Sequence, residues 1–198
     1  AELNDQVFQN QTLEYIGSFD DIIDERLFSF TSLTFDSPSI AAMESREFWS
    51  ISYDFERTSD TNGLTDTIVD DASNVVLSIA DGVFSVVGAS VSATATIPSV
   101  DTFTLTFAST SEGCSLEVNG AEVALAYTVG DSETAQGIGA ITSRVINGVS
   151  GYTLNRTSFN SDGMLLMNFL LNEGADTSVS DEVSAFNGGT AYVGTLVS

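Results

Sequence analysis

The chain has 198 residues, 42% of them hydrophobic, which is enough for one domain with a sizeable core. Its 28 acidic residues outnumber five arginines, and the formal net charge of −23 repels phosphate backbones and anionic lipids. Nucleic acid and membranes are therefore not expected as partners. The absence of histidine and lysine excludes histidine general bases, histidine-ligated zinc and Schiff-base chemistry, and Cys114, the only cysteine, cannot form an intrachain disulfide.

Residues 1–26 differ from the rest of the chain and are interpreted as an N-terminal arm. Five residues recur with the 4-3-4-3 spacing of a short helical face: Phe8, Thr12, Tyr15, Phe19 and Ile22. An extended arm fits the same residues equally well. No other part of the chain has a helical pattern of any length. The first residues lack the basic and apolar regions of a signal peptide, and none is expected.

From residue 27 onward, the apolar residues recur with a period of two, which predicts β-strands. Two pairs, Asp81-Gly82 and Asn119-Gly120, stand between such runs and are typical of tight hairpins. The pattern predicts an all-β fold, an antiparallel β-sandwich. The expected strands cover residues 27–35, 49–55, 75–79, 83–87, 91–97, 103–107, 116–118, 123–127, 141–146, 151–156 and 164–171.

Several of these segments resemble the laminin-G-like, concanavalin A-like jelly-roll domains. Leu33-Thr34-Phe35-Asp36 is similar to the early strand of that family, and Phe103–Phe107 is similar to its aromatic-T-L-T-F strand. The run Leu116–Val123 contains the V-N-G hairpin that follows this strand. The resemblance covers residues 27–171 and implies a jelly-roll body, which we extend over residues 27–198.

The C-terminal run Asn168–Thr177 resembles the "LNEG" segment that borders laminin-G-like modules in surface proteins of marine bacteria and phages. Ala175-Asp176 replaces the Ser-Gly of that segment. The resemblance implies a non-enzymatic decoration or fibre protein on a virion surface, made in the host cytoplasm. Residues 1–45 are expected to join it to further copies and to other virion proteins. The alternative is a monomeric carbohydrate-binding adhesion module, extracellular or on a cell surface.

Enzymatic activity is not expected. Glucanases of this fold resemble one another in an E-x-D-x-x-E strand, which does not occur here. Glu117 and Glu122 lie close across the Asn119-Gly120 hairpin, but both alternate with core residues and are expected to face solvent instead of a scissile bond. A glucanase-type glycoside hydrolase is therefore only the third hypothesis, after the two non-enzymatic ones.

Calcium is the one cofactor the sequence suggests, because hard cations bind clustered oxygen ligands. The candidate ligands lie in two neighbouring acidic loops: Asp60, Asn62 and Asp66 in the first, and Asp70 and Asp71 in the second. For each cluster, a solvated turn is the favoured alternative. For a glycan, Trp49 would be an obvious platform, but its alternation with other apolar residues predicts a core position.

One more pattern concerns residues 90–110, where serine and threonine alternate with apolar residues. This alternation predicts strands with a nearly uncharged outer face that could contact a neighbouring subunit. An ordinary solvated sheet face is the alternative. The residues in question are Ser90, Ser92, Thr94, Thr96, Thr102, Thr104 and Thr106.

Overall fold

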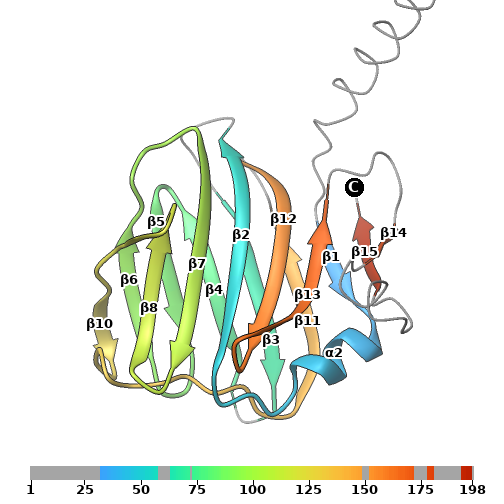
Figure 1. Ribbon diagram of the computed structural model, residues 1–198, viewed down its shortest axis with the longest axis horizontal. Coiled ribbons are helices and arrows are strands. Elements are labelled where there is room, and N and C mark those ends of the chain that lie inside the picture. Colours follow the sequence, from blue (N-terminus) through green and yellow to red (C-terminus); the bar gives the residue numbers. More distant parts are fainter. Residues whose placement is uncertain are drawn as a thin grey trace, which may run out of the picture.

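The alternating segments fold as two antiparallel β-sheets that pack face to face (Figure 1). The computed structural model describes residues 32–57, 63–71, 73–148, 152–171, 178–180 and 193–197. Within this part of the chain, the predicted all-β antiparallel sandwich is confirmed. The arm predicted at residues 1–26 lies outside the described residues.

The larger sheet has nine strands in the order β10-β6-β5-β4-β3-β11-β1-β15-β14. Some neighbouring strands in this sheet are far apart in sequence, as β3 and β11 are. The strands are β1 (Ser32–Phe35), β3 (Thr65–Asp70), β4 (Val75–Ala80), β5 (Val83–Val87), β6 (Ser92–Thr96), β10 (Ala126–Val129), β11 (Ile141–Asn147), β14 (Ser178–Ser180) and β15 (Val193–Val197).

The smaller sheet has six strands in the order β13-β12-β2-β7-β8-β9 and faces the viewer in Figure 1. Its strands are β2 (Trp49–Arg57), β7 (Thr102–Thr110), β8 (Gly113–Val118), β9 (Ala121–Glu122), β12 (Tyr152–Ser161) and β13 (Met164–Leu170). The alternating apolar residues of both sheets meet in one core. Phe84 of β5 packs on Phe107 of β7 with ring centroids 5.8 Å apart, and Phe35 of β1 packs edge-on against Phe169 of β13.

Both predicted hairpins form. Asn119 and Gly120 have φ angles of 53° and 74°, and Asp81 and Gly82 repeat that geometry, as expected for a two-residue turn with both residues left-handed. A third pair of the same kind, Asp162-Gly163, joins β12 to β13. It explains why β12 runs on to Ser161, whereas the expected strand ended at residue 156.

The strand expected at residues 123–127 is wrong as a simple return of the hairpin. Only Ala121 and Glu122 pair with β8, and the chain then crosses to the other sheet, where β10 pairs with β6. Tyr127 of β10 ties this crossing to the six-stranded sheet, because its ring packs against the core while its hydroxyl donates to the Cys114 carbonyl of β8 at 2.9 Å. The chain thus closes one side of the sandwich.

The sequence pattern also missed a short helix, α2 (Ser37–Met43), at the lower right of Figure 1. Asp36 caps it by accepting a hydrogen bond from the Ser39 backbone N–H at 2.9 Å, and a proline stands in its first turn. Ile40 and Met43 are buried against the sandwich. Seven residues are too few for a helical period to stand out in sequence.

Candidate functional site

Asp66, one of the predicted calcium ligands, is buried in the core. It lies on β3 with its side chain between the sheets and is 0% exposed. Arg144 of β11 donates to both carboxylate oxygens, at 3.0 Å from Nε and 2.6 Å from Nη2. Tyr53 of β2 donates its hydroxyl from the opposite sheet at 2.6 Å. The carboxylate is therefore committed to an ion pair inside the protein.

The surroundings of this pair keep it charged and fixed. The Arg144 guanidinium also lies 4.5 Å from the centre of the Phe35 ring. Burial by itself would lower the pKa of Arg144, but the charge and hydrogen bonds of Asp66 outweigh it and raise that pKa above its ordinary value. Burial and the nearby Asp66 charge raise the pKa of Tyr53, which stays a neutral donor. The cluster links the two sheets and has no route to a ligand in solvent.

Asp70 and Asp71 are consecutive residues at the end of β3. The Gly139 N–H donates to Asp70 at 2.5 Å, and a side chain at position 139 would come within 3.3 Å of an oxygen of either carboxylate. Within the described ranges, no group of three acidic or cysteine side chains is placed to hold a metal ion. Asp60 and Asn62 lie outside the described residues, so calcium binding by these loops stays a prediction that titration calorimetry can check.

Three other residues from the sequence analysis, Trp49, Glu117 and Glu122, lie where the alternation of their strands predicts them. Trp49 is buried, with its indole N–H donating to the Gln136 carbonyl at 2.6 Å, and it is not exposed to a sugar. Glu117 and Glu122 are directly paired across β8 and β9, and both are exposed to solvent. Because both side chains are open to solvent, the positions fit a solvated pair.

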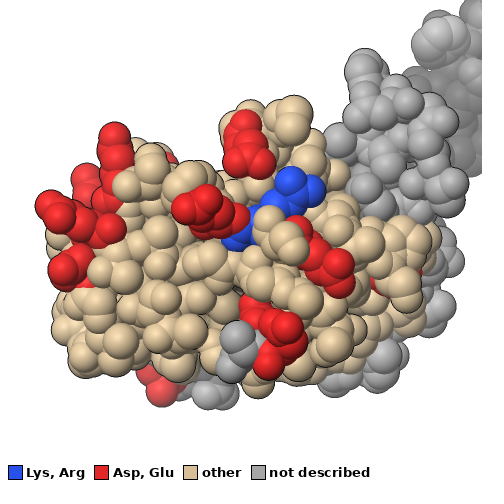
Figure 2. All heavy atoms as spheres, turned by 90° about the horizontal axis from the view of Figure 1, so that it is seen from below, with Lys and Arg blue, Asp and Glu red and all other residues tan. Residues whose placement is uncertain are grey.

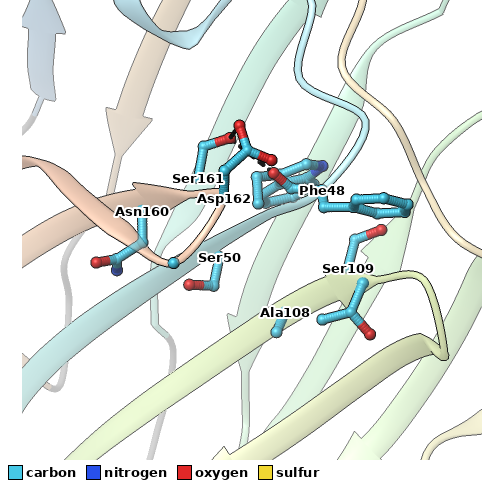
Figure 3. A pocket seen from close by; sticks show the side chains of 10 residues that line it. Phe48, Ser50, Ala108, Ser109, Asn160, Ser161 and Asp162 are labelled. Atoms are coloured by element: carbon cyan, nitrogen blue, oxygen red, sulfur yellow. Dashed lines mark hydrogen bonds between the residues drawn. The ribbon is translucent and has the colours of Figure 1, made fainter.

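A depression of about 280 Å³ lies at one end of the six-stranded sheet, on its outer face (Figure 3). Ser50 lies between Phe48 and Asn160, with Ala108 below them in this view. Ser161 fixes the rim, because its hydroxyl bonds to the Phe48 carbonyl at 2.8 Å and to the Asp162 carboxylate at 3.3 Å. A half-buried phenyl ring next to an amide and a carboxylate can accommodate the mixed apolar and polar faces of a sugar ring.

The outer face of the nine-stranded sheet carries no acidic or basic side chain at any described strand position. It is made of short hydroxyl-bearing, aliphatic and amide side chains, and we call it the neutral face. Its residues are Ser32, Thr34, Thr65, Thr67, Val69, Val76, Ser78, Ala80, Val83, Ser85, Val87, Ser92, Thr94, Thr96, Ala126, Val129, Ser143, Val145 and Asn147.

The strand pairing aligns these residues in rows across the sheet. One row runs from Asn147 through Thr65, Ser78 and Ser85 to Thr94. A parallel row contains Val145, Thr67, Val76, Val87 and Ser92. The uncharged surface is therefore continuous over β11, β3, β4, β5 and β6.

The prediction of one uncharged outer face over residues 90–110 is wrong in its grouping, because the predicted residues belong to two different sheets. Ser92, Thr94 and Thr96 belong to β6 and to the neutral face, whereas Thr102, Thr104 and Thr106 belong to β7 in the other sheet. The chain changes sheets between the two strands, so the two threonine sets lie on opposite sides of the sandwich. Alternation in the sequence shows which residues of a strand point outward, but it does not show to which sheet the strand belongs.

Charges gather elsewhere on the molecule. The outer face of the six-stranded sheet carries Asp54, which accepts from Arg156 at 2.6 Å, together with the exposed Glu56 and Glu117. Further carboxylates are scattered over the loops at the end of the sandwich shown in Figure 2, with basic side chains in one place only. The neutral face thus contrasts with the rest of a strongly acidic protein.

The geometry defines a protein of the antiparallel β-sandwich class. No protein-family model matches the chain, and no curated protein is similar to it at a significant level. No helix in the described part of the chain is long and apolar enough to cross a membrane.

Proposed function

We propose that this protein is a non-catalytic structural component of a surface assembly, a decoration or fibre protein that displays its β-sandwich on a virion. The neutral face is the observation that supports this proposal. A chain with a net charge of −23 meets other proteins most favourably where no carboxylate must lose its water. A wide uncharged sheet is such a place.

The resemblances in the sequence support a surface assembly, and a virion is the assembly that we propose. The V-N-G hairpin at Asn119-Gly120 and the segment from Asn168 to Thr177 are similar to parts of laminin-G-like modules in phage and bacterial surface proteins. In this proposal the six-stranded sheet, with its charges, faces the surroundings. The protein is made in the host cytoplasm and ends on the particle surface.

The assembly contacts predicted for residues 1–45 are limited by the fold. Leu33 of β1 and Ile40 and Met43 of α2 are buried in the core, so these side chains are not available to a partner. β1 also lies between β11 and β15, and a deletion through residue 45 would remove it from the sheet. A truncation that tests the arm must therefore end before Ser32.

Particle association is the direct test. Particles from the natural source are banded on a density gradient, and the chain is quantified by mass spectrometry in the particle band and in the soluble fraction. We expect a constant ratio of this chain to the major particle protein through repeated banding and a salt wash. Recovery in the soluble fraction alone would contradict the proposal.

Carbohydrate binding is the second candidate, and the depression beside Phe48 favours it. The phenyl ring would stack on a sugar face while Asn160 and the Asp162 carboxylate bond to hydroxyls. A glycan array, run with and without calcium, identifies the glycan that is then used in binding measurements. Phe48→Ala is then expected to weaken binding at least about tenfold. Val83→Ala, on the opposite sheet, is the matched control and should leave binding unchanged.

A further inference from the structure

The neutral face is large enough to form a specific interface. Its seven neighbouring strands from β10 to β1 span about 34 Å at about 4.8 Å per strand, and strands of five to six residues are about 18 Å long. The product, about 600 Å² on one partner, reaches the lower end of the size range of stable protein–protein interfaces, about 1,200–2,000 Å² over both partners.

The exposed side chains of this face favour burial. Among the described residues, five large hydrophobic side chains are exposed, and two of them, Val83 at 41% and Val87 at 49%, lie on β5 within the neutral face. A third, Val129 at 49%, pairs with Ser92 at its edge. Three of the five thus gather on or beside one sheet surface.

The charge of the chain argues that the partner is a second copy. A basic partner would bind the carboxylate-bearing surfaces in preference to an uncharged one. Two copies, each with a net charge of −23, repel each other through every charged surface, and the neutral face lets them meet without opposing carboxylates. Serine and threonine hydroxyls both donate and accept hydrogen bonds, so the rows around Ser78, Ser85 and Thr94 can pair with their own copies.

We infer that two copies of this chain pack through their neutral faces, sheet against sheet, as a symmetric dimer. This inference rests on the proposed function and names the partner of the same surface. A two-fold axis presents the same patch on both subunits, and two twisted sheets pack about 10 Å apart with their strands inclined by about 30°. Each charged six-stranded sheet then points outward, away from the contact.

Sedimentation velocity of the full chain, from micromolar to millimolar concentration, tests the dimer. The expected result is a reversible monomer–dimer equilibrium that strengthens as salt rises, because salt screens the repulsion between the two acidic subunits. An interface held by opposite charges would weaken under the same change. A monomer at all concentrations and salt conditions would overturn the inference.

Two matched variants locate the interface. Ser85→Glu puts a carboxylate inside the neutral face, between Ser78 of β4 and Thr94 of β6, and is expected to weaken the dimer at least about a hundredfold, because two like charges are buried in each symmetric contact. Ser115→Glu places the same charge on a half-buried outward position of β8 in the other sheet, and the dimer should persist. Thermal unfolding of both variants confirms that each is folded.

A dimer that survives Ser85→Glu, or is lost equally in Ser115→Glu, would overturn the assignment to the neutral face. The outcome is independent of the particle experiment. A chain that is found in particles but is monomeric refutes the dimer alone. A dimer that never enters particles refutes the proposed function alone.

Discussion

The ion pair between Arg144 and Asp66 makes the sharpest prediction about stability. Arg144→Met keeps most of the side-chain volume but removes the three hydrogen bonds that the guanidinium donates to the carboxylate. Asp66 then stays buried with the Tyr53 hydroxyl as its remaining donor from this cluster. Removing one partner of a buried ion pair typically costs about 3–5 kcal/mol of the free energy of unfolding. Because whole domains are stable by about 5–15 kcal/mol, this loss is large.

Urea unfolding followed by fluorescence provides the assay. Trp49 is the only tryptophan and is buried, with its ring stacked on Phe159 at a centroid distance of 6.2 Å, so its emission reports the opening of the core. With an m-value of about 2 kcal/mol per M, the expected loss moves the midpoint down by about 1.5–2.5 M.

A double variant separates the cost of leaving the Asp66 carboxylate without its ion-pair partner from the cost of lost packing. In Asp66→Asn combined with Arg144→Met, the buried carboxylate becomes a neutral amide whose oxygen can still accept from Tyr53. The double variant is therefore expected to be more stable than Arg144→Met alone. A single-variant loss below about 1 kcal/mol, or a double variant that is less stable than the single one, would refute the reasoning.

Three further predictions concern Tyr53, Cys114 and Gly113. Burial and the Asp66 charge raise the pKa of Tyr53, so above the ordinary value of 10.0 the unfolded chain loses a proton that the folded chain keeps. Stability is therefore retained below pH 10 and falls as the pH rises further, and urea midpoints should show a shallower alkaline decline for Tyr53→Phe. Burial also raises the pKa of Cys114, so Ellman's reagent should react slowly with the native protein and quickly in urea. Gly113→Ala should cost more stability than Gly120→Ala in thermal unfolding. Both glycines have positive φ, but a Cβ at 113 would strike the Ser132 carbonyl and a Cβ at 120 meets nothing within 4 Å.

The fold could be predicted to a large extent because its signals are local. Alternation in Trp49–Phe55 decides which side chains enter the core, and this is visible in a window of a few residues. The turns at Asp81-Gly82 and Asn119-Gly120 are equally local, because they depend on which residues tolerate positive φ. The helix α2 could not be predicted, because seven residues are too few to show a helical period.

The candidate sites could be predicted less well because they depend on contacts between distant residues. Asp66 reads in sequence as part of an acidic loop, and only its pairing with Arg144, 78 positions away, shows that it belongs to the core. The depression at Phe48 combines residues from β2, β7 and the β12–β13 turn, and no sequence window contains all three.

The sequence by itself determined the β-sandwich class, the outward and inward sides of most strands, and the net charge of −23. Only the tertiary structure decided which strands share a sheet. The threonines of β6 and β7 are separated by a few residues yet face opposite sides of the molecule, while Thr65 and Asn147 are neighbours on one face. The physical reason is that side-chain alternation is a property of one strand, whereas a surface is made by hydrogen-bonded pairing between strands.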